Sequence, residues 1–330
     1  MIFRNLMLVL TCITVLSGCK NQSEQKGSSP SRIPVIFDTD TNNELDDQHA
    51  LAYLLMNDSI FEVEGVTVNA TWGGGDIDKH YEEAVRVIDL CGLKGEVAVF
   101  KGANGKFPEI AEHTGDMVFD GSEAVDFIIK ESLKEREDTL ILLAVGKLTN
   151  VALALKKDPS LSSRVQVVWL GSNYPDPGEY NLENDTASLN YVLGTDVPFE
   201  MVTVRYGKSS GTAAVKVSVN EIRERMPGLG PVVKEPVTGR HGGSFTNFGD
   251  YSVSLFEHID QLEEGEYRSL FDMAAVAIVK DPSWASATMI PSPVYMNGRW
   301  VEQPENRRKI TIRENFDRDL IMADFFSSFK

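Results

Sequence analysis

Short apolar runs and amphipathic stretches alternate along the chain between residues 33 and 204. The apolar runs predict strands, and they lie at 33–37, 61–69, 97–101, 139–145, 165–170 and 198–204. The stretches between them have helical spacing, and they lie at 50–55, 76–90, 122–134, 148–155 and 184–193. This alternation predicts an α/β fold with an open, mostly parallel central sheet and helices on both faces.

The remainder of the chain is less regular. Residues 205–270 predict helices with loops, and Phe271–Val279 predicts a buried helix. Two strand-like segments, 294–302 and 307–315, suggest a terminal β-hairpin. Because no linker or internal repeat interrupts the alternating part, we expect one domain at residues 33–330, about 300 residues long and near the upper limit for a single core.

The end of the first predicted strand carries an unusual density of carboxylates. Five acidic residues follow one another there: Asp38, Asp40, Glu44, Asp46 and Asp47. Crowded carboxylates repel one another and raise each other's pKa, and no Lys or Arg lies between Arg32 and Lys79. Asp and Asn often cap helices, but two acidic elements within ten residues exceed what one cap needs. A bound divalent cation is the simplest compensation, and an all-oxygen site suits Ca²⁺ or Mg²⁺.

The first residues of the chain predict an export signal. Residues 1–18 contain one charged side chain, Arg4, and the apolar run Leu6–Leu16, as in a secretory signal peptide. The run ends in Leu-Ser-Gly-Cys, which resembles a lipobox in which Cys19 is acylated after cleavage. Residues 19–32 then form a polar, flexible tether. We expect a lipid-anchored protein of the bacterial cell envelope, in the outer membrane or facing the periplasm; an ordinary signal peptide or a membrane anchor is the alternative.

Composition disfavours two further features. The net charge of −17 argues against nucleic acid as a partner, and against membrane contact other than through a lipidated Cys19. Of the three cysteines, Cys12 would be removed with the signal and Cys19 lipidated. Cys91 then has no partner for an intramolecular disulfide, and its apolar neighbours predict a place in the core.

Four motifs in order resemble the inosine-uridine-preferring nucleoside hydrolase family. The first is DTDxxxxxDDxxAL after a hydrophobic strand, in the longer variant of the family signature. The others lie at 142–155 (LLAVGKLTNVALAL), 178–188 (GEYNLENDTAS) and 270–275 (LFDMAA). A HAD-type phosphatase is the alternative, because VIFDTDT also fits its hhhhDxDxT motif. Against it, no second acidic motif follows a later buried strand, and Asp272 opens a helix instead.

The resemblance implies a Ca²⁺-dependent hydrolase that cleaves the N-glycosidic bond of ribonucleosides and releases ribose and a free base, as in purine or pyrimidine salvage. It leaves open a homo-oligomer. Ca²⁺ would be held by Asp40, Asp47, Asp272 and the main-chain carbonyl of Val145. Asp40 would also act as the catalytic base. The substrate contacts that it implies are Asp46, Asn69, Glu179 and Asn181.

The chain departs from the family at one position. Phe271 stands where the family has a His before the metal-binding Asp, and this His protonates the leaving base in purine-preferring members. We expect His241, from the Gly-rich and aromatic segment 239–251, to be the replacement acid. A protein of another class, a non-catalytic Ca²⁺-dependent sugar- or nucleoside-binding lipoprotein, is the alternative. The presence of Asp40 argues against it, because a binder does not need a catalytic base.

Overall fold

The computed structural model describes residues 31–259 and 262–330. The predicted signal segment, Cys12, Cys19 and nearly all of the predicted tether lie outside the described residues. Arg32–Lys330 forms one compact unit, and Cys91 is buried within it. Among the described helices, none is both long enough and apolar enough to cross a membrane.

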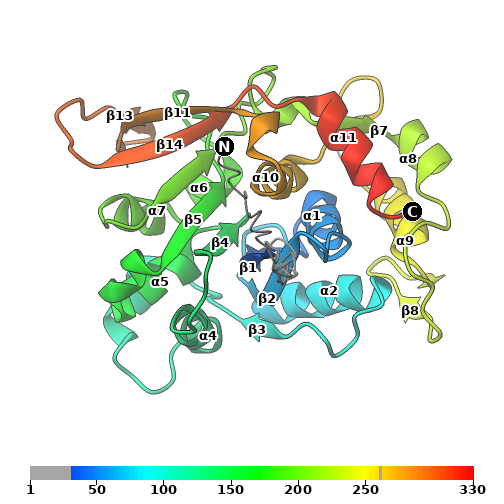
Figure 1. The fold of residues 1–330 in the computed structure, drawn as a ribbon, viewed down its shortest axis with the longest axis horizontal. Coiled ribbons are helices and arrows are strands. Elements are labelled where there is room, and N and C mark those ends of the chain that lie inside the picture. Colours follow the sequence, from blue (N-terminus) through cyan, green and yellow to red (C-terminus); the bar gives the residue numbers. More distant parts are fainter. Residues whose placement is uncertain (1–30, 260–261) are drawn as a thin grey trace, which may run out of the picture. The chain divides into compact units, whose positions relative to one another are not determined.

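An eight-stranded sheet runs through this unit, in the order β11-β14-β6-β5-β4-β1-β2-β3 (Figure 1). Its strands are β1 (Ile33–Thr39), β2 (Phe61–Val68), β3 (Val99–Lys101), β4 (Leu140–Ala144), β5 (Val165–Leu170), β6 (Phe199–Val202), β11 (Ser286–Pro291) and β14 (Lys309–Glu314). Every neighbouring pair is parallel except β11 and β14. The predicted open and mostly parallel sheet is therefore confirmed.

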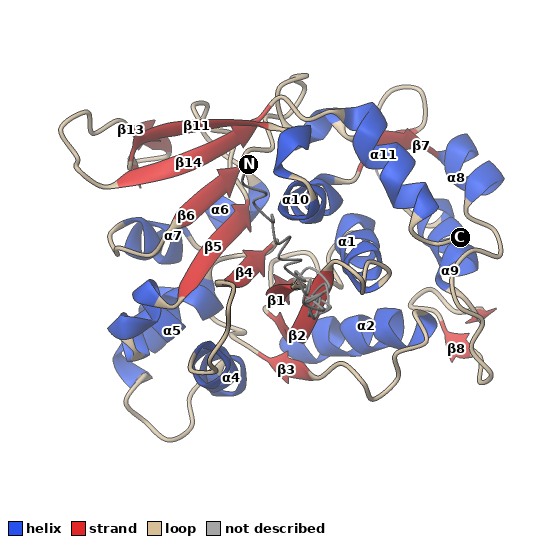
Figure 2. Ribbon diagram, viewed as in Figure 1, coloured by secondary structure: helices blue, strands red, loops and turns tan. Residues whose placement is uncertain are grey.

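Helices cover both faces of the sheet, as predicted (Figure 2). The helices are α1 (Leu45–Leu55), α2 (Ile77–Leu90), α3 (Phe107–Ile110), α4 (Ser122–Ser132), α5 (Thr149–Lys157), α6 (Tyr180–Asn184), α7 (Thr186–Leu193), α8 (Val219–Arg225), α9 (Phe248–Glu257), α10 (Phe271–Lys280) and α11 (Arg318–Ser327), with short 3₁₀ turns at Ala111–His113, Pro159–Ser163, Thr212–Ala214 and Pro282–Trp284. In β1, Val35 and Phe37 enter the core that contains α1, α2 and α10, whereas Ile36 enters the core that contains α4, α5 and α7. Successive strand residues face opposite ways, so a strand buried on both faces is apolar throughout.

Within residues 31–259 and 262–330, three two-stranded sheets lie outside the central sheet, and one of them corrects the predicted terminal hairpin. They pair β12 (Val294–Met296) with β13 (Arg299–Val301), β7 (Lys216–Ser218) with β10 (Tyr267–Ser269), and β8 (Val237–Thr238) with β9 (Ser244–Phe245).

The two segments predicted to form a hairpin with each other do not pair. The segment 294–302 folds back on itself through Asn297 and Gly298, both with positive φ, as a tight hairpin turn requires. The strand from 307–315 enters the central sheet as β14, between β6 and β11. This position buries Ile310 and Ile312, and pairing with the small hairpin would leave these two side chains without a core to pack against. The chain then ends in α11, which the sequence pattern did not predict.

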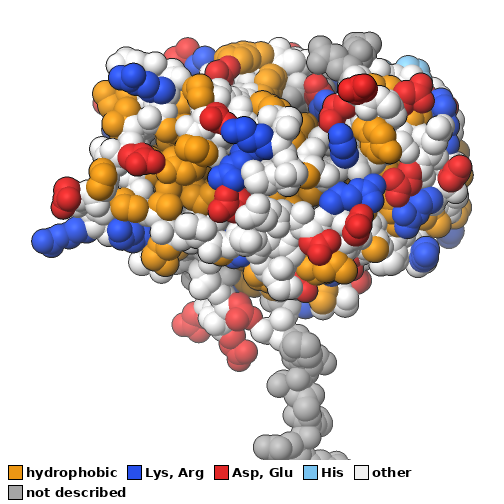
Figure 3. Space-filling model, turned by 90° about the horizontal axis from the view of Figure 1, so that it is seen from above, with side chains coloured by type: hydrophobic (Ala, Val, Ile, Leu, Met, Phe, Trp, Pro, Cys, Tyr) orange, Lys and Arg blue, Asp and Glu red, His pale blue; other side chains and the backbone are white. Residues whose placement is uncertain are grey.

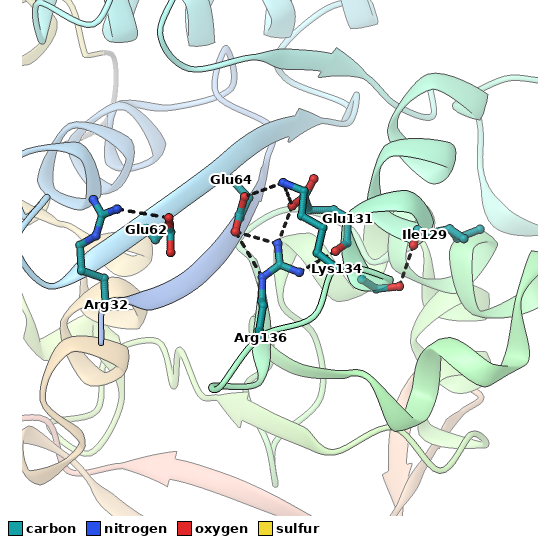
Figure 4. Close-up of polar contacts among 8 residues, drawn as sticks. Arg32, Glu62, Glu64, Ile129, Glu131, Lys134 and Arg136 are labelled. Carbon is teal, nitrogen blue, oxygen red and sulfur yellow. Dashed lines mark hydrogen bonds and ion pairs between the residues drawn. The ribbon is translucent and has the colours of Figure 1, made fainter. Parts of the chain in front are cut away.

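An ion-pair network fixes the chain between α4 and β4 (Figure 4). Glu64 on β2 accepts hydrogen bonds from Arg136 Nη2 at 2.7 Å and from Lys134 Nζ at 3.2 Å. Arg136 also pairs with Glu131 at the end of α4. The side chains of Glu64 and Arg136 are only 14% and 13% exposed, so water screens this pair less than it screens a surface ion pair. The network anchors the segment that leads into β4, the strand beside β1.

Candidate active site

The carboxyl ends of β1 and β4 lie side by side in the middle of the sheet. Val145 N donates to the carbonyl of Asp38 at 2.8 Å, and Asn43 N donates to the carbonyl of Asp40 at 2.8 Å. The first bond joins the end of β4 to β1, and the second closes a turn within the loop between β1 and α1. Asp46 and Asp47 follow in the first turn of α1, where the helix dipole favours negative charge. Open α/β sheets place their ligands at this edge.

A cavity of about 530 Å³ opens at this edge. Seven of the predicted site residues line it: Asp40, Asp46, Asp47, Val145, Glu179, Asn181 and Asp272. They come from four separate parts of the chain, which are the β1–α1 loop with the first turn of α1, the end of β4, the start of α6 and the start of α10. The volume lies within the range of small-molecule sites, roughly 300–1,000 Å³.

Three buried carboxylates form a group that could hold a metal ion. Asp46, Asp47 and Asp272 each offer an oxygen, and these oxygens lie within 4.8 Å of one another. Burial raises the pKa of Asp46 to about 7 and that of Asp47 and Asp272 well above the usual value, and the neighbouring negative charges add to it. Carboxylates this close are unfavourable unless protons or a cation compensate them. Oxygen donors alone fit a hard cation.

Asp40 lines the same cavity but lies outside that group of three. Its carboxylate accepts a hydrogen bond from the Thr71 hydroxyl. Burial raises its pKa to about 7, although the Thr71 bond opposes this. The predicted set of Asp40, Asp47 and Asp272 is thus brought to one cavity. Asp46, predicted as a substrate contact, lies in the group with Asp47 and Asp272.

Asn69 is not brought to the cavity. It is fully buried, and its Nδ2 donates to Asp38 Oδ1 at 2.8 Å. The other Asp38 oxygen accepts from Thr67 at 2.6 Å and Asn150 at 2.7 Å. Asn69 therefore holds Asp38 in the interior, and the predicted substrate contact at Asn69 has no support from its position. Asn69 directly follows β2, and its main-chain N–H donates to the carbonyl of Thr39 at 2.9 Å.

Glu179 and Asn181 lie where α6 begins. The Glu179 carboxylate accepts from the main-chain N–H groups of Asn181 at 3.0 Å and Leu182 at 2.9 Å, and burial raises its pKa to about 8. Asn181 Nδ2 donates to the carbonyl of Val145 at 2.7 Å. A carbonyl oxygen has two lone pairs, so Val145 can still offer one to a cation. Both residues are held ready for a ligand in the cavity.

His241 lies in a different cavity. It lines a smaller one of about 220 Å³, which shares Asn43 and Glu44 with the main cavity. Its ring stacks on His258, with 4.7 Å between ring centroids. The loop that carries it is held by the β8–β9 pairing. His241 thus lines a neighbouring cavity and not the one that Asp40 lines, and its role as the acid stays a prediction.

Two cations near the carboxylates escaped the sequence analysis. Arg268, on β10, pairs with Glu44 and lies 3.8 Å from Asp46 Oδ1. It comes 224 positions after Glu44, so no local pattern could reveal the pair. Buried Lys147 donates to the carbonyl of Gly105 at 2.5 Å, and its charge lowers the pKa of Asp40. The aromatic wall formed by Phe271 and Tyr206, 5.7 Å apart between ring centroids, was also missed as a unit.

Comparison with known proteins identifies the family. Residues 35–322 match the family described as inosine-uridine preferring nucleoside hydrolase. An uncharacterized protein of Schizosaccharomyces pombe is 28% identical over 222 residues, which cover 60% of this chain and 69% of that protein. The inosine-uridine preferring nucleoside hydrolase of Leishmania major is 23% identical over 286 residues, covering 78% of this chain and 87% of that protein.

A solved structure shares the fold. The purine-preferring ribonucleoside hydrolase from Gardnerella vaginalis superposes with a TM-score of 0.67 at 21% identity, covering 90% of this chain and 98% of that one. The family match over most of the chain favours the nucleoside hydrolase interpretation over a HAD-type phosphatase and over a non-catalytic binder. The chain belongs to the inosine-uridine preferring nucleoside hydrolase family and is a hydrolase of that family.

Proposed function

We propose that this protein hydrolyses the N-glycosidic bond of ribonucleosides with the help of Ca²⁺, releasing ribose and a free base. The observation that carries the proposal is the placing of Asp40 beside Asp46, Asp47 and Asp272 in one cavity. Attack of water on the anomeric carbon of a sugar needs a base to accept the water proton. It is also helped by oxygen ligands that hold a metal ion near that water. Relatives named for inosine and uridine support nucleosides as the substrate class.

The residues present fit a calcium ion. Asp40, Asp47, Asp272 and the carbonyl of Val145 would hold it, and Asp46 is close enough to add an oxygen. Ca²⁺ accepts six to eight oxygen ligands at flexible angles, whereas Mg²⁺ demands near-ideal octahedral geometry. When bound, such an ion lowers the pKa of a coordinated water and holds ribose hydroxyls.

The chain's own residues supply the remaining chemistry. Asp40 accepts the proton of the water that attacks the anomeric carbon, and its carboxylate lines the cavity where that water would lie. The transition state has oxocarbenium character, as in other glycoside hydrolysis, and nearby carboxylates stabilise its positive charge. Asp46, Glu179 and Asn181 line the same cavity and would hold the sugar hydroxyls.

The test is a panel of inosine, uridine and p-nitrophenyl riboside, assayed for free reducing sugar. Wild-type protein with Ca²⁺ should release ribose, and protein stripped with a chelator should not until Ca²⁺ is returned. Elemental analysis of protein purified without chelator should show about one calcium per chain. The Asp47→Ala variant should lose metal and activity together. Intact nucleoside recovered after tight binding, or zinc at full occupancy, would contradict the proposal.

A further inference from the structure

Cleavage of an N-glycosidic bond leaves an electron pair on the departing base, and this cavity is poorly suited to receive it. Seven carboxylate side chains line the cavity: Asp40, Glu44, Asp46, Asp47, Glu179, Glu263 and Asp272. Carboxylates repel a developing anion. Among the described residues that line the cavity, no His or Lys is present and Arg268 is the only basic side chain.

The surrounding structure fixes the position of Arg268. It lies in the middle of β10, which pairs with β7, and its side chain is only 13% exposed. Its Nη2 pairs with Glu44, and its guanidinium carbon lies 5.6 Å from the centroid of the Phe271 ring. The guanidinium of Arg268 therefore lies beside Phe271, the residue that stands where the family has its leaving-group acid. Arginine stacks well on aromatic faces, and this contact restrains its orientation.

Arg268 also keeps an unused donor. Its Nε is buried and has no hydrogen-bond partner among the described residues. A buried donor without a partner costs free energy, and functional sites are where such groups persist. Because the Nε is shielded from solvent, a ligand in the cavity would meet the Nη groups at the tip of the fork, of which Nη2 already pairs with Glu44. The arrangement is therefore more than an ion pair that neutralises Glu44.

We propose that Arg268 stabilises the leaving base in place of a proton donor, so that this site acts best on ribonucleosides whose base departs as an anion, such as uridine. The inference rests on the proposed hydrolase function. An arginine cannot act as the acid, because it does not lose its proton in proteins. It can donate charge-assisted hydrogen bonds to a nitrogen or carbonyl oxygen that is gaining negative charge.

The water oxygen forms a bond to the anomeric carbon, and the water proton passes to Asp40. The bond from the anomeric carbon to the base nitrogen breaks, and its electron pair stays on the base. In uracil this charge is shared with the carbonyl oxygen next to the cleaved nitrogen, and this oxygen would accept hydrogen bonds from the Arg268 guanidinium. The base takes a proton from solvent after release, and Asp40 returns its proton to solvent.

The test compares leaving groups of graded acidity in Arg268→Gln, Arg268→Lys and wild-type protein. The substrates are uridine, 5-fluorouridine and p-nitrophenyl riboside, whose leaving groups need progressively less stabilisation. Removing a donor of this kind costs about 10²–10³ in kcat. We expect a loss of this order for uridine in Arg268→Gln, a smaller loss for 5-fluorouridine and about tenfold or less for the nitrophenyl riboside.

Controls separate this role from a structural one. Arg268→Lys keeps a positive charge to pair with Glu44, so it should fold, but it lacks the planar guanidinium. Its turnover should fall most on uridine and least on p-nitrophenyl riboside, with smaller losses than those of Arg268→Gln. If Arg268→Gln does not fold, the leaving-group trend of Arg268→Lys decides. Arg223, on α8 and paired with Glu257, lies outside the cavity, and Arg223→Gln should match wild type on all three substrates. Calcium content should be unchanged in every variant.

Equal losses on the three substrates, or no loss on any, would overturn the inference and reduce Arg268 to a partner of Glu44. That outcome differs from failure of the proposed function, in which wild-type protein releases ribose from none of the three.

Discussion

Asp38 and Asp40 are two residues apart, yet their carboxylates have different surroundings. Asp38 accepts hydrogen bonds from Thr67, Asn69 and Asn150, and it does not line the cavity. Asp40 is bonded by Thr71 and lines the cavity. Burial raises the pKa of Asp38 to about 6 and that of Asp40 to about 7. Asp38 therefore braces the end of β1, and Asp40 is the member of the pair that can meet a water.

This contrast predicts different effects of the same substitution at the two positions. Asp40→Asn should lower kcat by about 10²–10⁴-fold, the usual contribution of a general base, with little change in thermal stability. Asp38→Asn should lower the melting temperature more, because an amide nitrogen would face the donors that the carboxylate oxygens now accept from. The measurements are kcat on the best substrate, thermal melting and calcium content. A metal-loaded Asp40→Asn protein that turns over at the wild-type rate would refute the role.

At this scale the sequence revealed the acids but not their partners. Asp40, Asp47 and Asp272 belong to local motifs with a fixed spacing, and each lines the cavity as predicted. Asn69 and His241 are single polar residues in loops, and only the packed structure decides which way such side chains point. Arg268 reaches the acids from another part of the chain, so its place depends on tertiary pairing.

At the scale of elements, the loop after β4 depends on one glycine. A Cβ atom on Gly146 would lie 2.7 Å from Asn69 Nδ2 and 2.9 Å from Asp40 Oδ1. The carbonyl of Gly146 accepts a hydrogen bond from Trp169 Nε1 at 3.0 Å, so the loop cannot easily move away. The glycine thus makes room for the carboxylate that lines the cavity.

We expect Gly146→Ala to displace the Asp40 carboxylate. Turnover should fall by about tenfold or more, since small misplacements of catalytic groups are costly, and the melting temperature should fall modestly through overpacking. Gly115→Ala is the matched control, because nothing lies within 4 Å of a Cβ at that position. Unchanged turnover in Gly146→Ala would show that the loop adapts without moving Asp40.

Local patterns predicted the elements that are buried on both faces. They failed to predict which strands pair when one segment could join either a hairpin or the central sheet. β1, β4 and β5 are continuous apolar runs, and a strand in the middle of a parallel sheet, buried on both faces, is the place that suits such a run. β14 has the same local character as a hairpin strand, and its partners β6 and β11 cannot be identified from its own residues. α11 was missed because its apolar residues do not follow a clear helical stripe.

For the whole molecule, the acidic groups that should affect stability most are the buried carboxylates of the cavity. The net charge is −17, but on the face in Figure 3 basic side chains lie among acidic ones. The buried acids are different, because they have no solvent to screen them. Asp40 and Asp46 have native pKa values of about 7, against an ordinary value of 3.8.

The stability of the metal-free protein should therefore depend on pH in a specific direction. Between about pH 4 and 7 these acids bind more protons in the folded than in the unfolded state, so their contribution is largest at low pH and is lost as pH rises. Ca²⁺ replaces those protons, so the stabilisation by Ca²⁺ should grow over the same range. It is measured as the difference in melting temperature between loaded and metal-free protein.

Two buried histidines work in the opposite direction. Burial lowers the pKa of His49 and His80 to about 4, so they favour the folded state as pH rises from about 4 to 6.5. The histidines contribute equally to the calcium-loaded and the metal-free protein. Their contribution therefore cancels in the difference between the two melting temperatures. A Ca²⁺ stabilisation that stays constant or shrinks as pH rises would mean that these acids do not hold the ion.

The cellular location remains a prediction from residues outside the described part. We propose that the protein is a cell-envelope lipoprotein tethered by acylated Cys19. Cys19→Ser should release it from the membrane fraction or block its maturation, as followed by fractionation and the size of the mature chain. Unchanged membrane association of Cys19→Ser would point to an uncleaved anchor.

The Glu44–Arg268 pair spans 224 positions of the chain, and Asp272 is as distant from Asp46 and Asp47. Contacts so far apart form late, since the intervening loop must close first. A chain that stops before β10 would contain six of the eight strands of the central sheet but neither Arg268 nor Asp272, so its acidic cavity would stay incomplete. We expect such a truncated chain to fold in part and to show no hydrolase activity.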